Sequence, residues 1–284
     1  MKVKKSLILL ELMTALFFLI CLYPFFIVLI NSAKGPFEVI QYPMSMPDNW
    51  GQIFKNMVSI WTNVNIQYQN SFKASIIITA VSLLAITVLS SQAAWVLVRT
   101  KTKTSNINFF VFVGAMVIPF QIVMFPLLSW FRMVYQATGI RLLRTYLGIV
   151  LAYVGFGSSL SIFLYHGFIK SIPYELEEAA KIDGCSRMQT FYIIISPILR
   201  PIHATVLVLN GIWIWNDYLL PLLVLGKGNR VQTIPLAVAN FAGAFVKQWD
   251  LILTAILMAM IPIIFFFLAA QKHIIKGMVA GSIK

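Results

Sequence analysis

A short polar stretch interrupts an otherwise apolar sequence and holds most of its capacity for specific chemistry. Residues 175–201 read ELEEAAKIDGCSRMQTFYIIISPILRP, with four acidic residues, basic residues on both sides of one glycine, and two prolines. Pro173 suits the first turn of a helix, where its missing N–H is no loss. The acidic residues that follow it are favourable near the positive end of the helix dipole. The pattern therefore predicts a short helix that starts near residue 173.

The face of this short helix carries small side chains. Leu176, Ala179, Ala180 and Asp183 share it by i, i+3, i+4, i+7 spacing, with the two alanines at its centre. Gly184 then ends the helix. A surface with little side-chain bulk allows close approach by a partner.

A second short helix is predicted after the glycine. Ser186 can cap it, and it runs through Met188 and Phe191 towards Pro197. The result is a helix–turn–helix elbow, whose shape suits docking into a groove on a soluble partner. The alternative is an amphipathic connector that rests on lipid headgroups.

The residue types needed for catalysis are not arranged for it. No G-x-x-x-x-G-K-[ST] pattern is present, so ATP hydrolysis by this chain is not expected. His166, His203 and His273 are scattered without metal-ligand spacing, and each is expected to pack or lie at an interface. No nucleophile–base pair stands out, and the sequence predicts a non-catalytic protein without a cofactor or metal of its own.

Candidate ligand contacts lie in a later apolar run. Asn210, Trp213 and Asp217 share a helical face, with Asn216 nearby, and such a stripe inside a membrane faces a cavity or a neighbouring helix. Amide groups with an indole suit a sugar, which offers hydroxyls and an apolar ring face. The alternative is an interfacial aromatic belt in which Asp217 pairs with a partner chain. Gln121 is a second candidate.

Composition sets the class of protein. The chain has 284 residues, is 60% hydrophobic, and has only 11% charged residues, against about 25% in an ordinary soluble domain. Its apolar runs are long and unbroken, which predicts an all-α integral membrane protein. The net charge of +13 does not indicate nucleic acid, because the basic residues cluster between the apolar runs.

Six spans are expected in a single transmembrane domain, since a spanning helix needs about 20 apolar residues. The N-terminal run is too long for a signal-peptide core and is expected to remain as the first helix. Pro119 and Pro126 should kink the third span, and small residues such as Gly155, Gly157, Ser158 and Ser159 should serve close helix packing. The expected spans are 7–30, 72–98, 106–131, 146–168, 201–224 and 251–271.

Charge distribution orients these spans. With both termini in the cytosol, the inner segments hold 13 of the 22 lysines and arginines. Arg132, Arg141 and Arg144 run against this bias because they fall on the outer side. The polar segment, residues 170–200, then lies in the cytosol between the fourth and fifth spans.

Several residues of the polar segment resemble the signature sequence of a known protein family. Glu178-Ala179-Ala180, Gly184, Ile194 and Pro197 match the EAA loop of ABC-importer permeases, which reads EAA, three residues, G, nine residues, I-x-L-P. Ser196 stands where leucine is usual. Residues 70–99, WNDYLLPLL (215–223) and the tail 271–284 resemble the sugar-importing subfamily, specifically the smaller permease of the maltose-type pair, although Trp95 replaces a tyrosine.

The resemblance implies a function and a set of partners. The EAA loop would be a coupling loop that sits in a cleft of an ATPase subunit, with Glu178, Ala179, Ala180, Asp183, Gly184 and Pro197 as its site residues. The partners would be a second permease, two ATP-binding cassette subunits that bind ATP and Mg, an extracytoplasmic solute-binding protein, and lipid of a bacterial inner membrane. ATP-driven closure would switch a shared path between outward- and inward-facing states.

Two rival functions remain open. One is an ABC importer for a non-sugar solute. The other is a self-sufficient secondary carrier, which would require intramembrane carboxylates, histidine relays or inverted repeats. Asp217 is the only deep acidic residue apart from Glu11 near the inner edge, and a lone carboxylate is a poor proton relay.

Overall fold

The computed structural model describes residues 5–64, 67–228, 230–244 and 248–282, and these residues form helices without strands. Four of the helices are long and apolar enough to cross a membrane, and two bent pairs raise the number of spans to as many as six. The expected all-α membrane fold is confirmed. The chain divides into two compact units, residues 1–69 with 237–262 and residues 70–236 with 263–284.

The first unit contains the first span and the loop that follows it. α1 (Lys5–Ser32) is apolar on all sides, and its side chains, such as those of Leu12, Phe17 and Leu19, are about 60% exposed or more, as lipid contact requires. The unit continues with α2 (Pro36–Gln41) and α3 (Gln52–Thr62), and it ends with most of α13 (Ile234–Ala244) and the first part of α14 (Trp249–Ser282).

Buried polar groups hold the loop after α1 in shape. The Lys34 ammonium is fully buried and donates to the carbonyl oxygen of Tyr42 at 2.7 Å and to Asn31 Oδ1 at 3.2 Å. The Asn56 amide, from α3, donates to the carbonyl oxygens of Ser32 and Lys34. These bonds satisfy groups that would otherwise be costly to bury.

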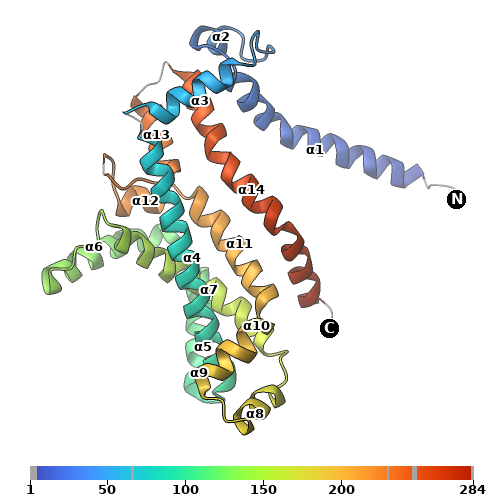
Figure 1. Ribbon diagram of the computed structural model, residues 1–284, viewed down its shortest axis with the longest axis vertical. Coiled ribbons are helices and arrows are strands. Elements are labelled where there is room, and N and C mark those ends of the chain that lie inside the picture. Colours follow the sequence, from blue (N-terminus) through green and yellow to red (C-terminus); the bar gives the residue numbers. More distant parts are fainter. Residues whose placement is uncertain (1–4, 65–66, 229, 245–247, 283–284) are drawn as a thin grey trace. The chain divides into compact units, whose positions relative to one another are not determined.

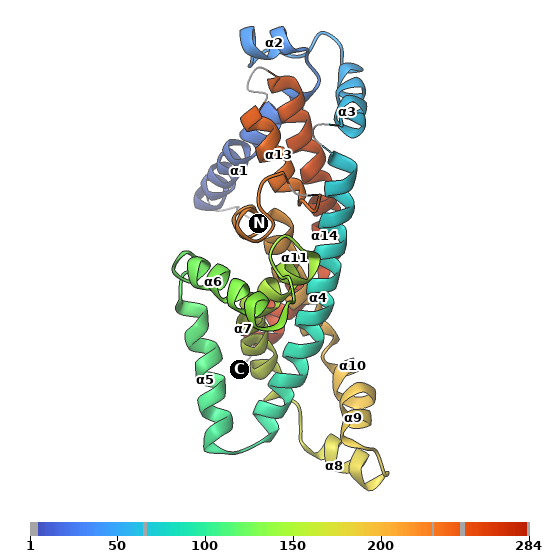
Figure 2. The same ribbon diagram turned by 90° about the vertical axis from the view of Figure 1, so that its left-hand side faces the viewer.

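The second unit holds the remaining helices. Figures 1 and 2 show α4 descending to the end of this unit where α8 lies. The helices are α4 (Tyr68–Arg99), α5 (Lys103–Val117), α6 (Phe120–Thr138), α7 (Tyr146–Ile169), α8 (Glu175–Ile182), α9 (Arg187–Gln189), the π-helix η1 (Thr190–Ile195), α10 (Ser196–Ile198), α11 (Arg200–Asn216) and α12 (Leu219–Val224).

Two of the expected spans are broken. α5 and α6 meet at 108° across Pro119, so the kink expected there is a sharp turn (Figure 2), while Pro126 lies inside α6. In the fifth span, α11 ends at Asn216 and α12 begins at Leu219, so residues 201–224 are not one continuous helix. Asp217 causes this second break, because its carboxylate accepts from the backbone N–H groups of Leu219 and Leu220.

The core of the second unit is packed around α7, which carries small residues where its neighbours come close. A Cβ atom on Gly157 would lie 2.6 Å from Ile86 Cδ1, on α4, and 2.7 Å from Asn210 Oδ1, on α11. Gly155, two residues earlier, has nothing within 4 Å of the same position. The packing role expected for the small residues is therefore confirmed at Gly157, and Gly155 has no such neighbour.

This difference gives a matched test of the helix packing. Gly157→Val should lower the free energy of unfolding by about 1–3 kcal/mol, because it overfills the contact among α4, α7 and α11. Gly155→Val adds the same side chain to open space on the same helix and should be close to wild type. Thermal unfolding of the two purified variants in detergent measures the difference, and equal melting temperatures would contradict this packing.

Candidate functional site

The first helix of the polar segment has acidic residues in its first turn and a capping motif at its C-terminal end. α8 begins at Glu175, directly after Tyr174, with Glu175, Glu177 and Glu178 in its first turn. At the other end Gly184 adopts φ +80°, a left-handed conformation that favours glycine. The N–H of Cys185 bonds the carbonyl of Ala180 and that of Gly184 bonds Lys181, which is a Schellman motif. The break predicted at Gly184 is confirmed.

The second helix starts as predicted at Ser186. The Ser186 hydroxyl accepts from the N–H of Gln189, and the Gln189 side chain accepts from the N–H of Ser186, which is a capping box. The helix then widens into η1 immediately before Pro197, which has no N–H to continue the α-helical ladder. It meets α11 at 76°, so the polar segment changes direction where it enters the fifth span.

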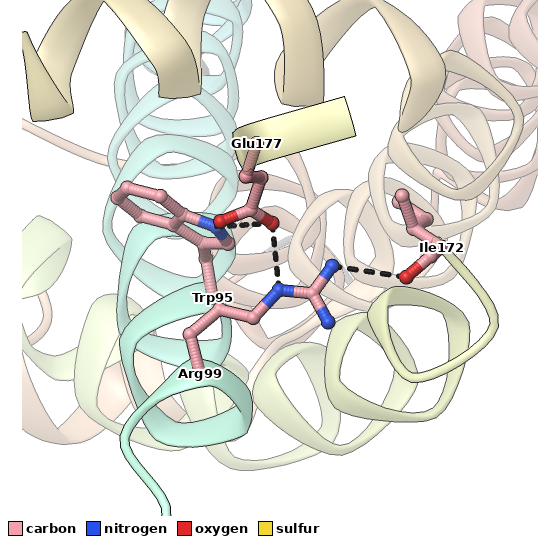
Figure 3. Close-up of polar contacts among 4 residues, drawn as sticks. All are labelled: Trp95, Arg99, Ile172 and Glu177. Atoms are coloured by element: carbon pink, nitrogen blue, oxygen red, sulfur yellow. Dashed lines mark hydrogen bonds and ion pairs between the residues drawn. The ribbon is translucent and has the colours of Figure 1, made fainter. Parts of the chain in front are cut away.

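A cluster of polar contacts fastens α8 to the end of α4 (Figure 3). The Glu177 carboxylate accepts from Arg99 Nε at 2.6 Å and from Trp95 Nε1, which is 3.1 Å from both of its oxygens. Arg99 Nη2 also donates to the carbonyl oxygen of Ile172 at 3.0 Å. The Arg99 and Glu177 side chains are only 13% and 9% exposed. We call these four residues the clamp.

Aromatic contacts extend the clamp along the second helix. The Trp95 ring lies 5.3 Å from that of Phe191, and the Arg187 guanidinium stands 6.0 Å from the centre of the Trp95 ring. Gln92, three residues before Trp95, donates to the Tyr192 hydroxyl at 2.6 Å. Both arms of the polar segment are thus held by one end of α4.

The residues expected to form one small-residue face of α8 differ in burial. Ala180 is buried at 5% exposure, whereas Leu176, Ala179 and Asp183 are exposed. The exposed side of the polar segment also includes Ile182, at 86%, together with Glu178, Gly184 and Pro197. Ala180 therefore packs against its own chain, and Ala179 and Ile182 are the apolar residues available to a partner.

Asn210 lies in the contact between α7 and α11. Its amide is 2% exposed and donates to the Ser161 hydroxyl at 3.0 Å and to the carbonyl oxygen of Val206 at 2.9 Å. Asn210 Oδ1 faces Gly157, where a Cβ atom would collide with it. In this conformation Asn210 joins two helices and has no exposed amide to offer a ligand.

Trp213 and Asp217 meet at a third residue. Tyr153, on α7, donates its hydroxyl to Asp217 Oδ2 at 3.1 Å, and its ring packs edge-on against Trp213 with centres 5.4 Å apart. Trp213 keeps 38% of its surface exposed. Asn216 is exposed and donates to the carbonyl oxygen of Ile212. The expected stripe therefore has a buried end at Asn210 and an open end at Trp213 and Asn216.

The remaining candidates lie apart from this cluster. Gln121 is exposed in the first turn of α6. His166 stacks on Phe109 with ring centres 3.6 Å apart, and His203 Nδ1 lies 2.6 Å from the Tyr165 hydroxyl, which is the packed role expected of them. The His273 side chain lies outside the described residues. Among the side chains that the structure does describe, no group of three metal-binding residues occurs.

Comparison with known proteins places these features in a family. The binding-protein-dependent transport system inner membrane component family matches residues 86–280. A probable starch degradation products transport permease, AmyC of Thermoanaerobacterium thermosulfurigenes, is 40% identical, and the match covers 94% of this chain and 93% of that protein. The melibiose/raffinose/stachyose import permease MelC of Bacillus subtilis is 36% identical over 92% of this chain and 91% of its own. This chain belongs to the binding-protein-dependent transport inner membrane family.

A solved structure supports the same fold for this permease. A bacterial ABC transporter that imports the acidic polysaccharide alginate contains a chain that matches with a TM-score of 0.77 at 21% identity. The match covers 93% of this chain and 95% of that one. The protein is therefore a multi-pass inner membrane component of an ABC importer, and its family consists of transport permeases.

The clamp and Tyr153 are the residues of the permease that sequence reasoning missed. Trp95 and Arg99 are spaced i, i+4 at the end of a span, and the signal for a shared contact was therefore present on α4. Nothing in the sequence identified Glu177, rather than Glu175 or Glu178, as their partner 82 and 78 residues away.

The clamp predicts a difference between two adjacent glutamates of the permease. Glu177→Gln should expose the amides of residues 171–199 to roughly tenfold faster hydrogen exchange or more, because charge-assisted bonds each contribute about 1.5–3 kcal/mol. Glu178→Gln, one residue later and exposed, is the matched control and should leave exchange unchanged. Hydrogen–deuterium exchange of the purified protein measures both, and equal protection in the two variants would refute the clamp.

Proposed function

We propose that this chain is the permease subunit of a sugar importer and that the polar segment is its coupling loop, docked in the cleft of an ATPase subunit. The observation that carries the proposal is the exposed apolar edge of α8, with Ala179 and Ile182, on a helix that the clamp holds to α4. An apolar edge in a segment otherwise rich in charge suits a protein groove better than water.

The clamp supports a mechanical role for this edge. α8 and the end of α4 are joined by an ion pair, a shared indole N–H and an arginine–carbonyl bond, so a displacement of α8 moves α4 with it. α4 is 32 residues long and belongs to the membrane-spanning part of the chain. Closure of two ATPase subunits would thus be transmitted into the bilayer as a movement of a spanning helix.

Sidedness and partners follow from this assignment. With the coupling loop in the cytosol, both termini are cytosolic as well, and the opposite side receives an extracytoplasmic solute-binding protein. The proposed complex pairs this chain with a second permease and two ATP-binding cassette subunits. ATP and Mg bind to the cassettes, and the energy for transport comes from them.

The cargo proposed is a sugar or oligosaccharide. It is supported by the relatives named for starch degradation products and for melibiose, raffinose and stachyose. The open end of the fifth-span cluster, Trp213 with Asn216, supplies an indole face and an amide, which suit a pyranose ring. Gln121 is exposed on α6 and is proposed as a further contact. Asn210 and Asp217 position this surface through Ser161 and Tyr153.

Matched substitutions at two glycines test the role of the coupling loop. Gly184 and Gly139 both have positive φ, +80° and +73°, and a Cβ atom on either would meet nothing within 4 Å. Valine at either position costs about 1–2 kcal/mol of backbone strain. We expect Gly184→Val to lower ATP-driven uptake about tenfold or more while ATP hydrolysis continues, and Gly139→Val to retain coupling. Uptake and hydrolysis are measured together in vesicles that hold the full importer.

A direct change to the docking edge complements the glycine pair. Ala179→Arg should abolish co-purification of the ATPase, because a long charged side chain blocks close approach, whereas Ser171→Arg, exposed just before α8, should not. Full uptake in both Gly184→Val and Ala179→Arg would rule out the docking role. Uptake by this chain alone, driven by an ion gradient, would replace the importer with a secondary carrier.

The sugar contact is tested at Trp213. Trp213→Ala should raise the half-saturating sugar concentration about 3- to 10-fold, since an aromatic contact contributes about 0.5–1.5 kcal/mol beyond its buried area. Trp213→Phe keeps a ring and should stay near wild type. Transport of labelled starch-derived oligosaccharide, with the binding protein in excess, measures both, and equal kinetics in the alanine and phenylalanine variants would exclude a stacking role.

A further inference from the structure

Three arginines that run against the positive-inside bias gather around one hollow. Arg132 lies on α6, and Arg141 and Arg144 lie in the connection between α6 and α7. With the end of α12 they surround a pocket of about 690 Å³, and Tyr135 and Gln136 add polar groups to its wall. We call it the arginine pocket. The three arginines that oppose the expected charge bias thus lie close together in the folded chain.

The arginine pocket and the polar segment lie at opposite ends of α7. Arg144 and Thr145 precede the first residue of this helix, and the polar segment follows its last residue, Ile169. A 24-residue helix is about 36 Å long, which exceeds the hydrocarbon thickness of a bilayer. Both views of the chain place α6 away from α8 along α7 (Figures 1 and 2), and Figure 1 places α12 away from α8 as well. The pocket therefore belongs to the opposite membrane surface.

The backbone conformation of Arg144 and two hydrogen bonds to backbone carbonyl oxygens fix the position of this residue. Arg144 has φ +65°, an unfavourable conformation for a residue with a side chain. Its N–H donates to the carbonyl oxygen of Val224 at 2.8 Å, and its Nη2 donates to that of Lys227 at 3.3 Å. Backbone strain of this kind persists where surrounding structure enforces it, and it is concentrated at binding sites.

The other two arginines are available to a ligand. Arg132 and Arg141 are exposed, and no carboxylate lies within ion-pair distance of either in the described part of the chain. The wall of the pocket contains no acidic residue. The site therefore has a strong positive potential, and its ligand should be anionic.

The surface beside the pocket is apolar. On α6, Arg132, Tyr135 and Gln136 share one face, while Trp130 and Met133 lie on another and are 53% and 63% exposed. Exposed tryptophan and tyrosine next to cationic side chains are typical of the membrane–water interface. An anionic group held here would have acyl chains or another apolar body lying along α6.

We propose that the arginine pocket binds the phosphate of an anionic phospholipid headgroup in the membrane leaflet opposite the coupling loop. Guanidinium forks match phosphate oxygens in pairs, and basic pockets between membrane helices suit such headgroups. The hollow shape of the site and the apolar face of α6 favour a lipid over the acidic surface of a soluble protein. The choice of leaflet depends on the proposed cytosolic position of the coupling loop. The proposal that the pocket binds a phospholipid does not depend on it.

The test uses the whole importer, purified from vesicles that contain phosphatidylglycerol and phosphatidylcholine in equal parts. Native mass spectrometry then counts the phospholipids that stay bound. The wild type should retain phosphatidylglycerol in preference to phosphatidylcholine. The double variant Arg132→Gln, Arg141→Gln should lose about tenfold or more of this adduct, since each arginine contributes charge-assisted bonds. The control Lys55→Gln, Lys73→Gln removes two charges outside the pocket and should retain the adduct.

The other outcomes separate the possible ligands. Retention of the adduct by the double arginine variant overturns the proposal, as does equal retention of both lipids by the wild type. Displacement of the lipid by inorganic phosphate would indicate a site for free anions. Unchanged lipid with weakened binding-protein affinity would assign the arginines to protein docking, and either result contradicts the proposal. A double Arg→Lys variant, which keeps the charge, should retain an intermediate amount of phosphatidylglycerol and verifies that any loss is not misfolding.

Discussion

The Glu177 carboxylate is largely covered, with 9% of its side chain exposed, where a membrane helix meets a polar segment, and the arrangement of that end of the protein depends on how the carboxylate is neutralised. Arg99 and Trp95 both donate to it, and Arg99 continues to the backbone carbonyl of Ile172 (Figure 3). Removing one partner of such a buried pair costs about 3–5 kcal/mol, because the other charge is left without compensation. The clamp is therefore an attachment that resists displacement, which the proposed coupling role requires.

The two ends of the second unit differ in whether their arginines are paired with a carboxylate. At the end that carries α8, the Glu177 carboxylate neutralises the Arg99 cation of α4. At the other end, Arg132 and Arg141 remain exposed around a hollow and leave room for an external anion. Between them, α7 is packed so closely that Gly157 admits no side chain and the buried amide of Asn210 is satisfied within the bundle. The closely packed middle of the unit separates the proposed coupling loop from the proposed lipid site.

Local signals in the sequence predicted the local structure well. Gly184 and Ser186 each have a mechanism that acts over a few residues, and the break and the helix start lie where these mechanisms place them. The second helix does not end at Pro197 but continues to Ile198. Hydropathy likewise predicted the membrane helices. Contacts between distant residues could not be predicted in the same way. Helical spacing places Ala179 and Ala180 on one face of α8. It does not show that Ala180 packs against the rest of the protein while Ala179 stays exposed. Pro119 predicted a kink but not its angle of 108°. The break at Asp217 has a local cause, the bonds of its carboxylate to the N–H groups of Leu219 and Leu220, and the sequence analysis considered Asp217 only as a ligand or partner contact.

The most direct measurement of the account is a distance between α8 and α4 in the working importer. Spin labels at Lys181 and Leu89 would occupy exposed positions on the two helices, away from the docking residues Ala179 and Ile182, with Cys21 and Cys185 replaced. Double electron–electron resonance can then compare the complex before and after ATP binding. If the clamp moves α8 and α4 together, the distance distribution stays unchanged on ATP binding. A shift of about 5 Å or more, one helical turn, would show that α8 moves independently of α4 and would contradict the account.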